Sequence, residues 1–253
     1  MLDSMFAERL IAHRGHARVA PENTLAAVDS ALAAGARAVE IDVQLSADGE
    51  AFLMHDRTLE RMCGRRESLG ELSGAQLREL RAAEPERFGP RFAAEPLASL
   101  AAFSERIARA PQVHAYVELK RVSIERFGVD AVLDAVLPML LPIHGRCTLI
   151  SFDVGVLRAA RQRTHLPVGP VLITWEQRRD PLLVGLEPQV VFCDDEKLPA
   201  VGPLDVPGGA LAVYEVDTAH RARQLFARGV RFVETFAVEA LLNELRAGAE
   251  DAP

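Results

Sequence analysis

At Ala38-Val39-Glu40-Ile41-Asp42-Val43, the sequence alternates acidic residues with branched apolar ones. Successive side chains of a β-strand point to opposite faces, so Glu40 and Asp42 share one face and the three branched residues share the other. A solvent-facing polar edge would show the same alternation, but the strands of a parallel barrel are buried on both faces. Buried carboxylates are costly unless they are paired or bound to a cation. The stretch therefore predicts a core strand that carries two acidic groups.

Further apolar runs of strand length lie on both sides of this segment: Leu10–Ala12, Val113–Leu119, Cys147–Ser151, Val168–Ile173, Val190–Phe192, Ala210–Tyr214 and Phe232–Glu234. Stretches of helical period separate them: Thr24–Ala34, Leu97–Ala110, Val129–Leu140, Val154–Arg163 and Ala219–Arg228. This alternation is typical of a parallel α/β protein, either a closed (β/α)₈ TIM barrel or a doubly wound open sheet. The chain has 253 residues, close to the roughly 250 of one barrel. We predict a single TIM-barrel domain over residues 1–253.

The segment Gln44–Met54 interrupts the alternation and predicts a β-hairpin. Its Asp-Gly pair, Asp48 and Gly49, is typical of a two-residue turn. With these two as the whole loop, the antiparallel register places Asp42 opposite His55. The hairpin would thus return His55 to the end of the second strand.

A second interruption, Arg57–Pro96, is too long for an ordinary loop between a strand and a helix. It is rich in Arg, Glu, Gly and Pro, with one short helical segment near Gly74–Arg81. We predict a small inserted segment, about residues 57–96, that follows the second-strand hairpin and lies over one mouth of the barrel.

Composition excludes several classes of protein. The net charge of −7 argues against a nucleic-acid partner held through many phosphate contacts. No run approaches the roughly 18 apolar residues of a membrane helix, so no stable membrane insertion is expected. The residues Met1–Arg9 lack the pattern of a secretory signal, and Cys63, Cys147 and Cys193 fit neither a disulfide framework nor a thiolate zinc site. We expect a cytoplasmic protein with a small-molecule partner, and nothing in the sequence specifies an oligomeric state.

The first strand runs into Ala12-His13-Arg14-Gly15, at the end where barrel enzymes place catalytic groups. Arg offers a planar fork to an anionic oxygen, and His moves a proton near neutral pH. Pro21-Glu22-Asn23-Thr24 follows, and by itself it is best interpreted as a helix start, with Asn23 or Thr24 as the cap.

Another strand carries Glu118 and Lys120 on one face. The pair could be a simple ion pair, but it adds a third carboxylate to Glu40 and Asp42. Hard cations such as Mg²⁺ and Ca²⁺ take oxygen ligands of this kind. Carboxylates, histidines, Arg and Lys at adjacent strand ends indicate a site that stabilises a phosphate transition state.

Together these motifs resemble the glycerophosphodiester phosphodiesterase family. The resemblance rests on their order and spacing: Ala12–Gly15, Pro21–Thr24, Glu40–Val43, His55-Asp56 with Leu59 and Arg61, Glu118–Lys120, and Ser151–Asp153. It implies a phosphodiesterase TIM barrel with an insertion, and hydrolysis of a glycerophosphodiester to sn-glycerol 3-phosphate and an alcohol. It also implies a divalent metal, Mg²⁺ or Ca²⁺, as cofactor. The residue roles that it implies are catalytic for His13 and His55, metal-binding for Glu40, Asp42 and Glu118, and phosphate-binding for Arg14 and Lys120.

The C-terminal part departs from the family pattern. A Trp with a nearby Asn is expected on the seventh strand, where this chain has Tyr214-Glu215-Val216-Asp217. On the last strand Glu234-Thr235-Phe236-Ala237 replaces Thr-Asp-x-Pro. These positions are expected to shape substrate preference, with Tyr214 either stacking on the alcohol or packing in the barrel core.

Two other functions remain open. The first is a related barrel phosphodiesterase that acts on phospholipid head groups, but glutamates balance the Arg residues of Arg57–Pro96 and so weaken the case for a membrane-binding surface. The second is a non-catalytic barrel that binds a phosphorylated ligand, which would require loss of part of the metal or His set. The whole set is present, so hydrolysis is the function that we expect.

Overall fold

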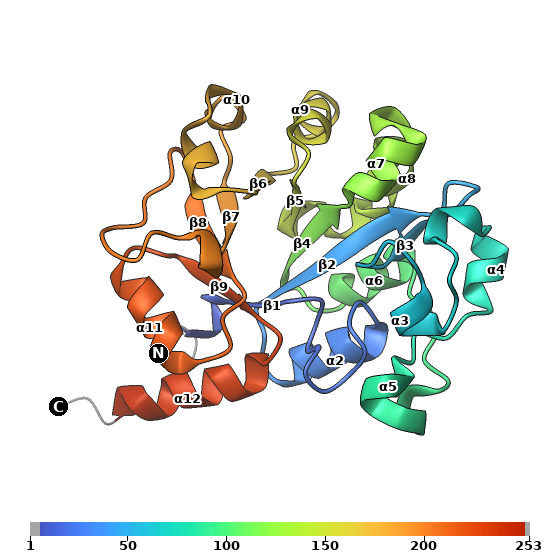
Figure 1. Ribbon diagram of the computed structural model, residues 1–253, viewed down its shortest axis with the longest axis horizontal. Coiled ribbons are helices and arrows are strands. Elements are labelled where there is room, and N and C mark those ends of the chain that lie inside the picture. The colour runs from blue at the N-terminus through green and yellow to red at the C-terminus, as the bar shows by residue number, and fades with distance from the viewer. Residues whose placement is uncertain (1–5, 251–253) are drawn as a thin grey trace.

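Eight parallel strands close into a barrel in the computed structural model, which describes residues 6–250 (Figure 1). The strands in spatial order are β1 (Leu10–Ala12), β2 (Ala38–Leu45), β4 (His114–Leu119), β5 (Cys147–Ser151), β6 (Val168–Leu172), β7 (Val190–Asp194), β8 (Ala210–Tyr214) and β9 (Phe232–Thr235). The barrel closes because β1 pairs in parallel with both β2 and β9. The predicted TIM barrel is confirmed, and the open-sheet alternative is excluded.

Helices surround the barrel: α2 (Leu25–Ala33), α6 (Leu100–Ala108), α7 (Arg121–Phe127), α8 (Val129–Met139), α9 (Val154–Arg163), α10 (Pro181–Val184), α11 (Ala219–Ala227) and α12 (Val238–Glu250). Several of these helices have an N-cap residue with a hydroxyl or carboxylate side chain. Thr24, Ser99, Asp153 and Thr218 each accept a hydrogen bond from a backbone N–H of the first turn. The helices predicted from periodicity are therefore present, and local capping residues set where they start.

The alternation along β2 divides its side chains between two cores. Val39, Ile41 and Val43 pack in the main core between barrel and helices. Ala38 belongs to the barrel interior, together with Ile11, Tyr116, Ile150, Val171, Val190, Phe192 and Ala212. Glu40 and Asp42 point to the same interior and are 2% and 1% exposed. The solvent-facing alternative for these two acids is therefore wrong.

The hairpin after β2 is present, but its predicted register was wrong by one residue. Strand β3 (Ala51–Leu53) pairs antiparallel with β2, and Ser46 N–H donates to the Glu50 carbonyl. Three residues form the loop, because Gly49 adopts a φ of 85° and its N–H donates to the Ser46 carbonyl. Asp42 consequently lies opposite Met54, whose N–H donates to the Asp42 carbonyl.

The insertion contains α3 (Glu60–Cys63), α4 (Gly74–Arg78), α5 (Pro85–Phe88) and the 3₁₀ turns Leu69–Glu71 and Gly89–Phe92. A separate hydrophobic cluster holds it against the hairpin: Phe52, Met54, Leu59, Met62, Leu69, Leu72, Leu77, Ala82 and Leu97. In Figure 1 α3 and α4 lie beside the β2–β3 hairpin, and α5 lies below them. No described residue of 57–96 lines the cavity at the barrel mouth, so the insertion flanks that cavity and does not cover it.

Within residues 6–250, no helix combines the length and apolar character that crossing a bilayer requires. The cytoplasmic location stays a prediction.

Candidate active site

A cavity of about 90 Å³ lies inside the mouth of the barrel. Its lining is His13, Arg14, Glu40, His55, Glu118, Lys120, Ile150, Phe152, Val171, Phe192, Tyr214, Glu215 and Glu234. The lining contains every residue predicted for the site except Asp42. The Asp42 carboxylate lies next to this lining, because it pairs with both Arg14 and Lys120.

Three carboxylates from neighbouring strands meet at this mouth. β2 pairs with β4 so that Asp42 is in register with Glu118. Oxygens of Glu40, Asp42 and Glu118 lie within 4.8 Å of one another. Lys120 Nζ lies 3.1 Å from Asp42 Oδ1 and 3.0 Å from Glu118 Oε1, so it pairs with two of the three acids.

Arg14 makes a second set of ion pairs with the cluster. Its backbone has a φ of 55°, its N–H donates to Glu40 Oε2 at 3.2 Å, and its Nε lies 3.2 Å from Asp42 Oδ2. Burial alone would raise the pKa of Asp42, but Lys120 and Arg14 hold that pKa well below its usual range. Asp42 is therefore an anion that the protein itself neutralises.

The tetrapeptide before α2 contributes more than a helix start. Thr24 is the cap, as predicted, and accepts from Ala27 N–H at 3.1 Å. Asn23, with a φ of 56°, donates from Nδ2 to Asp42 Oδ2 at 2.8 Å and accepts from Asp42 N–H at 3.0 Å. Glu22 accepts a hydrogen bond from Arg14 Nη1 at 3.0 Å. The residue chemistry did not single out Asn23 and Glu22; the family motif was the only signal.

His13 has a defined orientation. Its Nε2 lies 3.7 Å from Glu40 Oε2, and its Nδ1 lies 3.3 Å from Glu215 Oε1. The ring stacks on Phe236, with centroids 4.6 Å apart and planes 6° from parallel. Burial, followed by the nearby Arg14 charge, lowers the pKa of His13. The imidazole is thus held neutral and oriented towards the acidic cluster.

His55 lies two residues after the end of β3, and its side chain lines the cavity. Its Nδ1 lies 2.9 Å from Asp56 Oδ1, and Arg61 Nε donates to Asp56 Oδ2 at 2.8 Å. The buried Gln44 amide donates to three successive carbonyls, at 2.9 Å to Met54, 3.2 Å to His55 and 2.7 Å to Asp56. Gln44 thereby holds the segment that carries His55. This is why His55 lies in the site as predicted, although the observed hairpin register differs by one residue from the predicted one.

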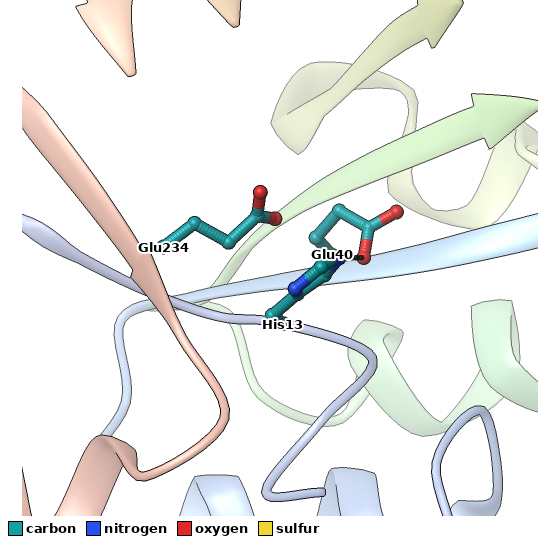
Figure 2. Close-up of side chains that lie close together, drawn as sticks. All are labelled: His13, Glu40 and Glu234. Carbon is teal, nitrogen blue, oxygen red and sulfur yellow. Dashed lines mark ion pairs between the residues drawn. The ribbon is translucent and has the colours of Figure 1, made fainter. Parts of the chain in front are cut away.

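Glu234 is a fourth buried carboxylate that was not among the predicted site residues. It is 2% exposed, and its carboxylate lies within 4.8 Å of donor atoms of His13 and Glu40 (Figure 2). Burial raises its pKa well above the usual value, against the opposing effect of the Arg14 charge, and the Asp42 charge adds to the rise. The same alternation that marked the acids of β2 places Glu234 with Phe232 on the inner face of β9. The sequence therefore contained the signal.

Tyr214 lines the cavity, and its ring centroid lies 6.3 Å from that of His13. It also packs against the barrel-interior cluster. Both uses expected for this side chain are therefore compatible with its position.

The donor set fits a hard divalent cation. Glu40 Oε1 is buried without a hydrogen-bond partner, and burial together with the Asp42 charge raises the pKa of Glu40 well above its usual value. Such a carboxyl favours its protonated form unless a cation supplies the missing charge. With Asp42 and Glu118 it offers the oxygen ligands that Mg²⁺ and Ca²⁺ prefer.

A closed parallel barrel with carboxylates, imidazoles, Arg and Lys at its mouth places the chain among TIM-barrel proteins built for charged ligands. A family model described as the glycerophosphoryl diester phosphodiesterase family matches residues 13–235, and the chain belongs to this family.

Comparisons with individual proteins agree with this assignment. Glycerophosphodiester phosphodiesterase 1 of Rattus norvegicus is 41% identical over 90 residues, which are 36% of this chain and 27% of that protein. The match thus spans about a quarter of the relative's length. A phosphodiesterase of Oleispira antarctica, solved in complex with the product sn-glycerol-3-phosphate, superposes with a TM-score of 0.80 at 23% identity, covering 96% of this chain and 99% of that one. Glycerophosphodiester phosphodiesterase from Agrobacterium tumefaciens gives 0.73 at 22%, covering 93% and 99%. The two structures show the same fold.

Proposed function

We propose that this protein hydrolyses glycerophosphodiesters to sn-glycerol 3-phosphate and an alcohol, using a divalent cation and two histidines. The observation that carries the proposal is the convergence of Glu40, Asp42 and Glu118 within 4.8 Å, in a mouth also lined by His13 and His55. Family membership and the product bound by the Oleispira antarctica relative support the substrate class.

Glu40, Asp42 and Glu118 would hold the cation, Mg²⁺ or Ca²⁺. Bound there, it supplies polarisation of the phosphoryl oxygens and offsets the charge that develops in the transition state. Arg14 and Lys120 bind and orient the phosphate, since both guanidinium and ammonium line the same cavity. Their contacts with Asp42 keep them in position before substrate arrives.

His13 accepts the proton of the attacking hydroxyl, which belongs either to water or to the neighbouring glycerol carbon through a cyclic intermediate. Its lowered pKa leaves the ring unprotonated near neutral pH, as a base requires. His55 returns a proton to the leaving alcohol. Asp56 contacts Nδ1 of His55 and leaves Nε2 as the ring atom for that transfer.

Release of sn-glycerol 3-phosphate from glycerophosphocholine tests the proposal, with Mg²⁺, with Ca²⁺ and with EDTA. His13→Ala and His55→Ala should each lower the rate roughly 10²–10⁴-fold, the usual contribution of an acid or base. Glu40→Gln should abolish the metal-dependent release. His220→Gln is the matched control, because His220 is exposed and bonds only to Gln224. Losses below about tenfold in both His variants would refute the acid–base assignment.

The non-catalytic alternative predicts a different result. A binding barrel would retain glycerophosphocholine or sn-glycerol 3-phosphate tightly with metal present and release no product. The structure retains the full set of acids, histidines and cationic side chains, which favours turnover.

A further inference from the structure

A second group of donor atoms shares one member with the first. His13, Glu40 and Glu234 each offer an atom within 4.8 Å of the others, and Glu40 also belongs to the group with Asp42 and Glu118. Figure 2 shows the Glu234 side chain extending from β9 towards the place where Glu40 and His13 meet. Unlike the group of Glu40, Asp42 and Glu118, this second group contains an imidazole.

Two of the three side chains in this group have oxygens without a partner. Glu234 Oε1 and Glu40 Oε1 are buried and accept no hydrogen bond, and both residues line the cavity at 2% exposure. A buried carboxylate oxygen without a donor is costly, so the pair indicates a ligand that the side chains are placed to receive. The ion pairs of the Arg14 and Lys120 side chains go to Glu22, Asp42 and Glu118, so neither side chain pairs with these two oxygens.

His13 has the orientation of a metal ligand. Nε2 is the ring atom nearer Glu40, at 3.7 Å, while Nδ1 lies 3.3 Å from Glu215 Oε1 without hydrogen-bond geometry. A histidine that binds a metal usually has a carboxylate beside its other ring nitrogen, and the Glu215 carboxylate lies beside Nδ1 here. The stack on Phe236 holds the same orientation from the ring face.

We propose that His13 Nε2, Glu40 and Glu234 form a second divalent-cation site, suited to an ion of the zinc type. One imidazole and two carboxylates are ligands that Zn²⁺ takes readily, whereas the all-oxygen group suits Mg²⁺ or Ca²⁺. Occupation of the second site withholds His13 from proton transfer, so the ion acts as an inhibitor. Inhibition by the ion rests on the proposed function, whereas binding of the ion does not.

Zinc binding is measured first, on purified full-length protein in excess Mg²⁺, by competition with a chromogenic zinc chelator. The wild-type protein should bind Zn²⁺ at a site that Glu234→Gln weakens at least about tenfold, the lower end of the loss expected for a disturbed metal site. His220→Gln should bind as the wild type does, since that histidine is exposed. X-ray absorption at the zinc edge should show one imidazole, absent in His13→Gln. Thermal unfolding of each variant verifies that it is folded. Equal zinc affinity in the wild type and Glu234→Gln would overturn the site.

Inhibition by zinc is measured separately. With saturating Mg²⁺, Zn²⁺ should inhibit diester hydrolysis, and the midpoint should rise at least about tenfold in Glu234→Gln, each rate being normalised to that variant's zinc-free value. Equal midpoints would overturn inhibition through this site. A protein that hydrolyses nothing with any metal refutes the proposed function, while the chelator competition still decides the second site.

Discussion

Replacement of Asn23 by Gly should destabilise the protein more than any exposed polar substitution, because it removes two buried hydrogen bonds from Asp42. Asn23 Nδ2 donates to Asp42 Oδ2 at 2.8 Å and Asn23 Oδ1 accepts from Asp42 N–H at 3.0 Å. Both residues are buried, at 3% and 1% exposure, so water does not replace the lost partners without rearrangement.

The magnitude follows from these two contacts. A hydrogen bond to a charged group contributes about 1.5–3 kcal/mol, and a buried donor left without a partner costs about 1–3 kcal/mol. The free energy of unfolding should therefore fall by about 2.5–6 kcal/mol. At roughly 2–4 °C per kcal/mol for a chain of this size, the Tm should drop by about 5–24 °C. Glycine is the chosen replacement because Asn23 has a φ of 56°, which glycine adopts without strain.

Thermal unfolding by circular dichroism, with EDTA, is the measurement. Asn23→Ala is the matched comparison, because it removes the same hydrogen bonds and adds the strain of an Ala at positive φ. Its free energy of unfolding should be about 1 kcal/mol lower than that of Asn23→Gly. A fall in Tm below about 3 °C for Asn23→Gly would show that the Asn23–Asp42 pair does not stabilise the fold as argued.

Three further outcomes are expected. Gln44→Leu should lower kcat by a larger factor than it raises KM, because the segment carrying His55 loses its three side-chain hydrogen bonds. Steady-state kinetics in which kcat equals that of the wild type would contradict this. Phe236→Ala should lower kcat and shift the acidic limb of the pH–rate profile, because the His13 ring loses its stacking partner and gains water; an unchanged profile would remove Phe236 from the site. A carboxyl with a raised pKa binds more protons when folded, so metal-free protein should lose stability as pH rises above the ordinary Glu range of about 4.3 towards the raised value. Glu234→Gln should flatten the fall in Tm that sets in as pH rises above the ordinary Glu range with EDTA, and an unchanged slope would argue against the raised pKa.

The sequence was most informative where one strong energetic term determines the structure. Acids alternating with branched residues along Ala38–Val43 have one inexpensive arrangement, with the apolar face against the helices and the carboxylates in the barrel mouth, and the structure has that arrangement. The hairpin was less predictable because Asp48-Gly49 is compatible with loops of two or three residues, which differ little in energy. The observed three-residue loop has Gly49 at positive φ and is closed by the Ser46–Glu50 hydrogen bond. The residue types alone do not distinguish this loop from a two-residue loop.

The site residues that escaped prediction share a physical origin. Asn23 was best explained locally, as a helix cap, whereas its side chain is used by Asp42, a partner 19 positions away. Glu234 was interpreted through the family pattern that it departs from, and its neighbours His13 and Glu40 come from strands at the other end of the chain. The Asn23–Asp42 contact forms when β2 packs beside β1, and the Glu234 contacts form only when the barrel closes and brings β9 beside β1.

The balance of charge in the mouth connects the two proposals. Asp42 is matched by Arg14 and Lys120, and its pKa is held low. Glu40 and Glu234 have no equivalent pairing, and burial raises the pKa of both. The carboxyls that most readily keep a proton in the absence of a cation therefore lie on the β2–β9 side, next to His13, whereas Asp42 stays ionised through its ion pairs. Glu40 belongs to both donor groups, so a cation at either proposed site would bind it. The two proposals then differ in the remaining ligands: a cation that prefers oxygen would take Asp42 and Glu118, and one that prefers nitrogen would take His13 with Glu234.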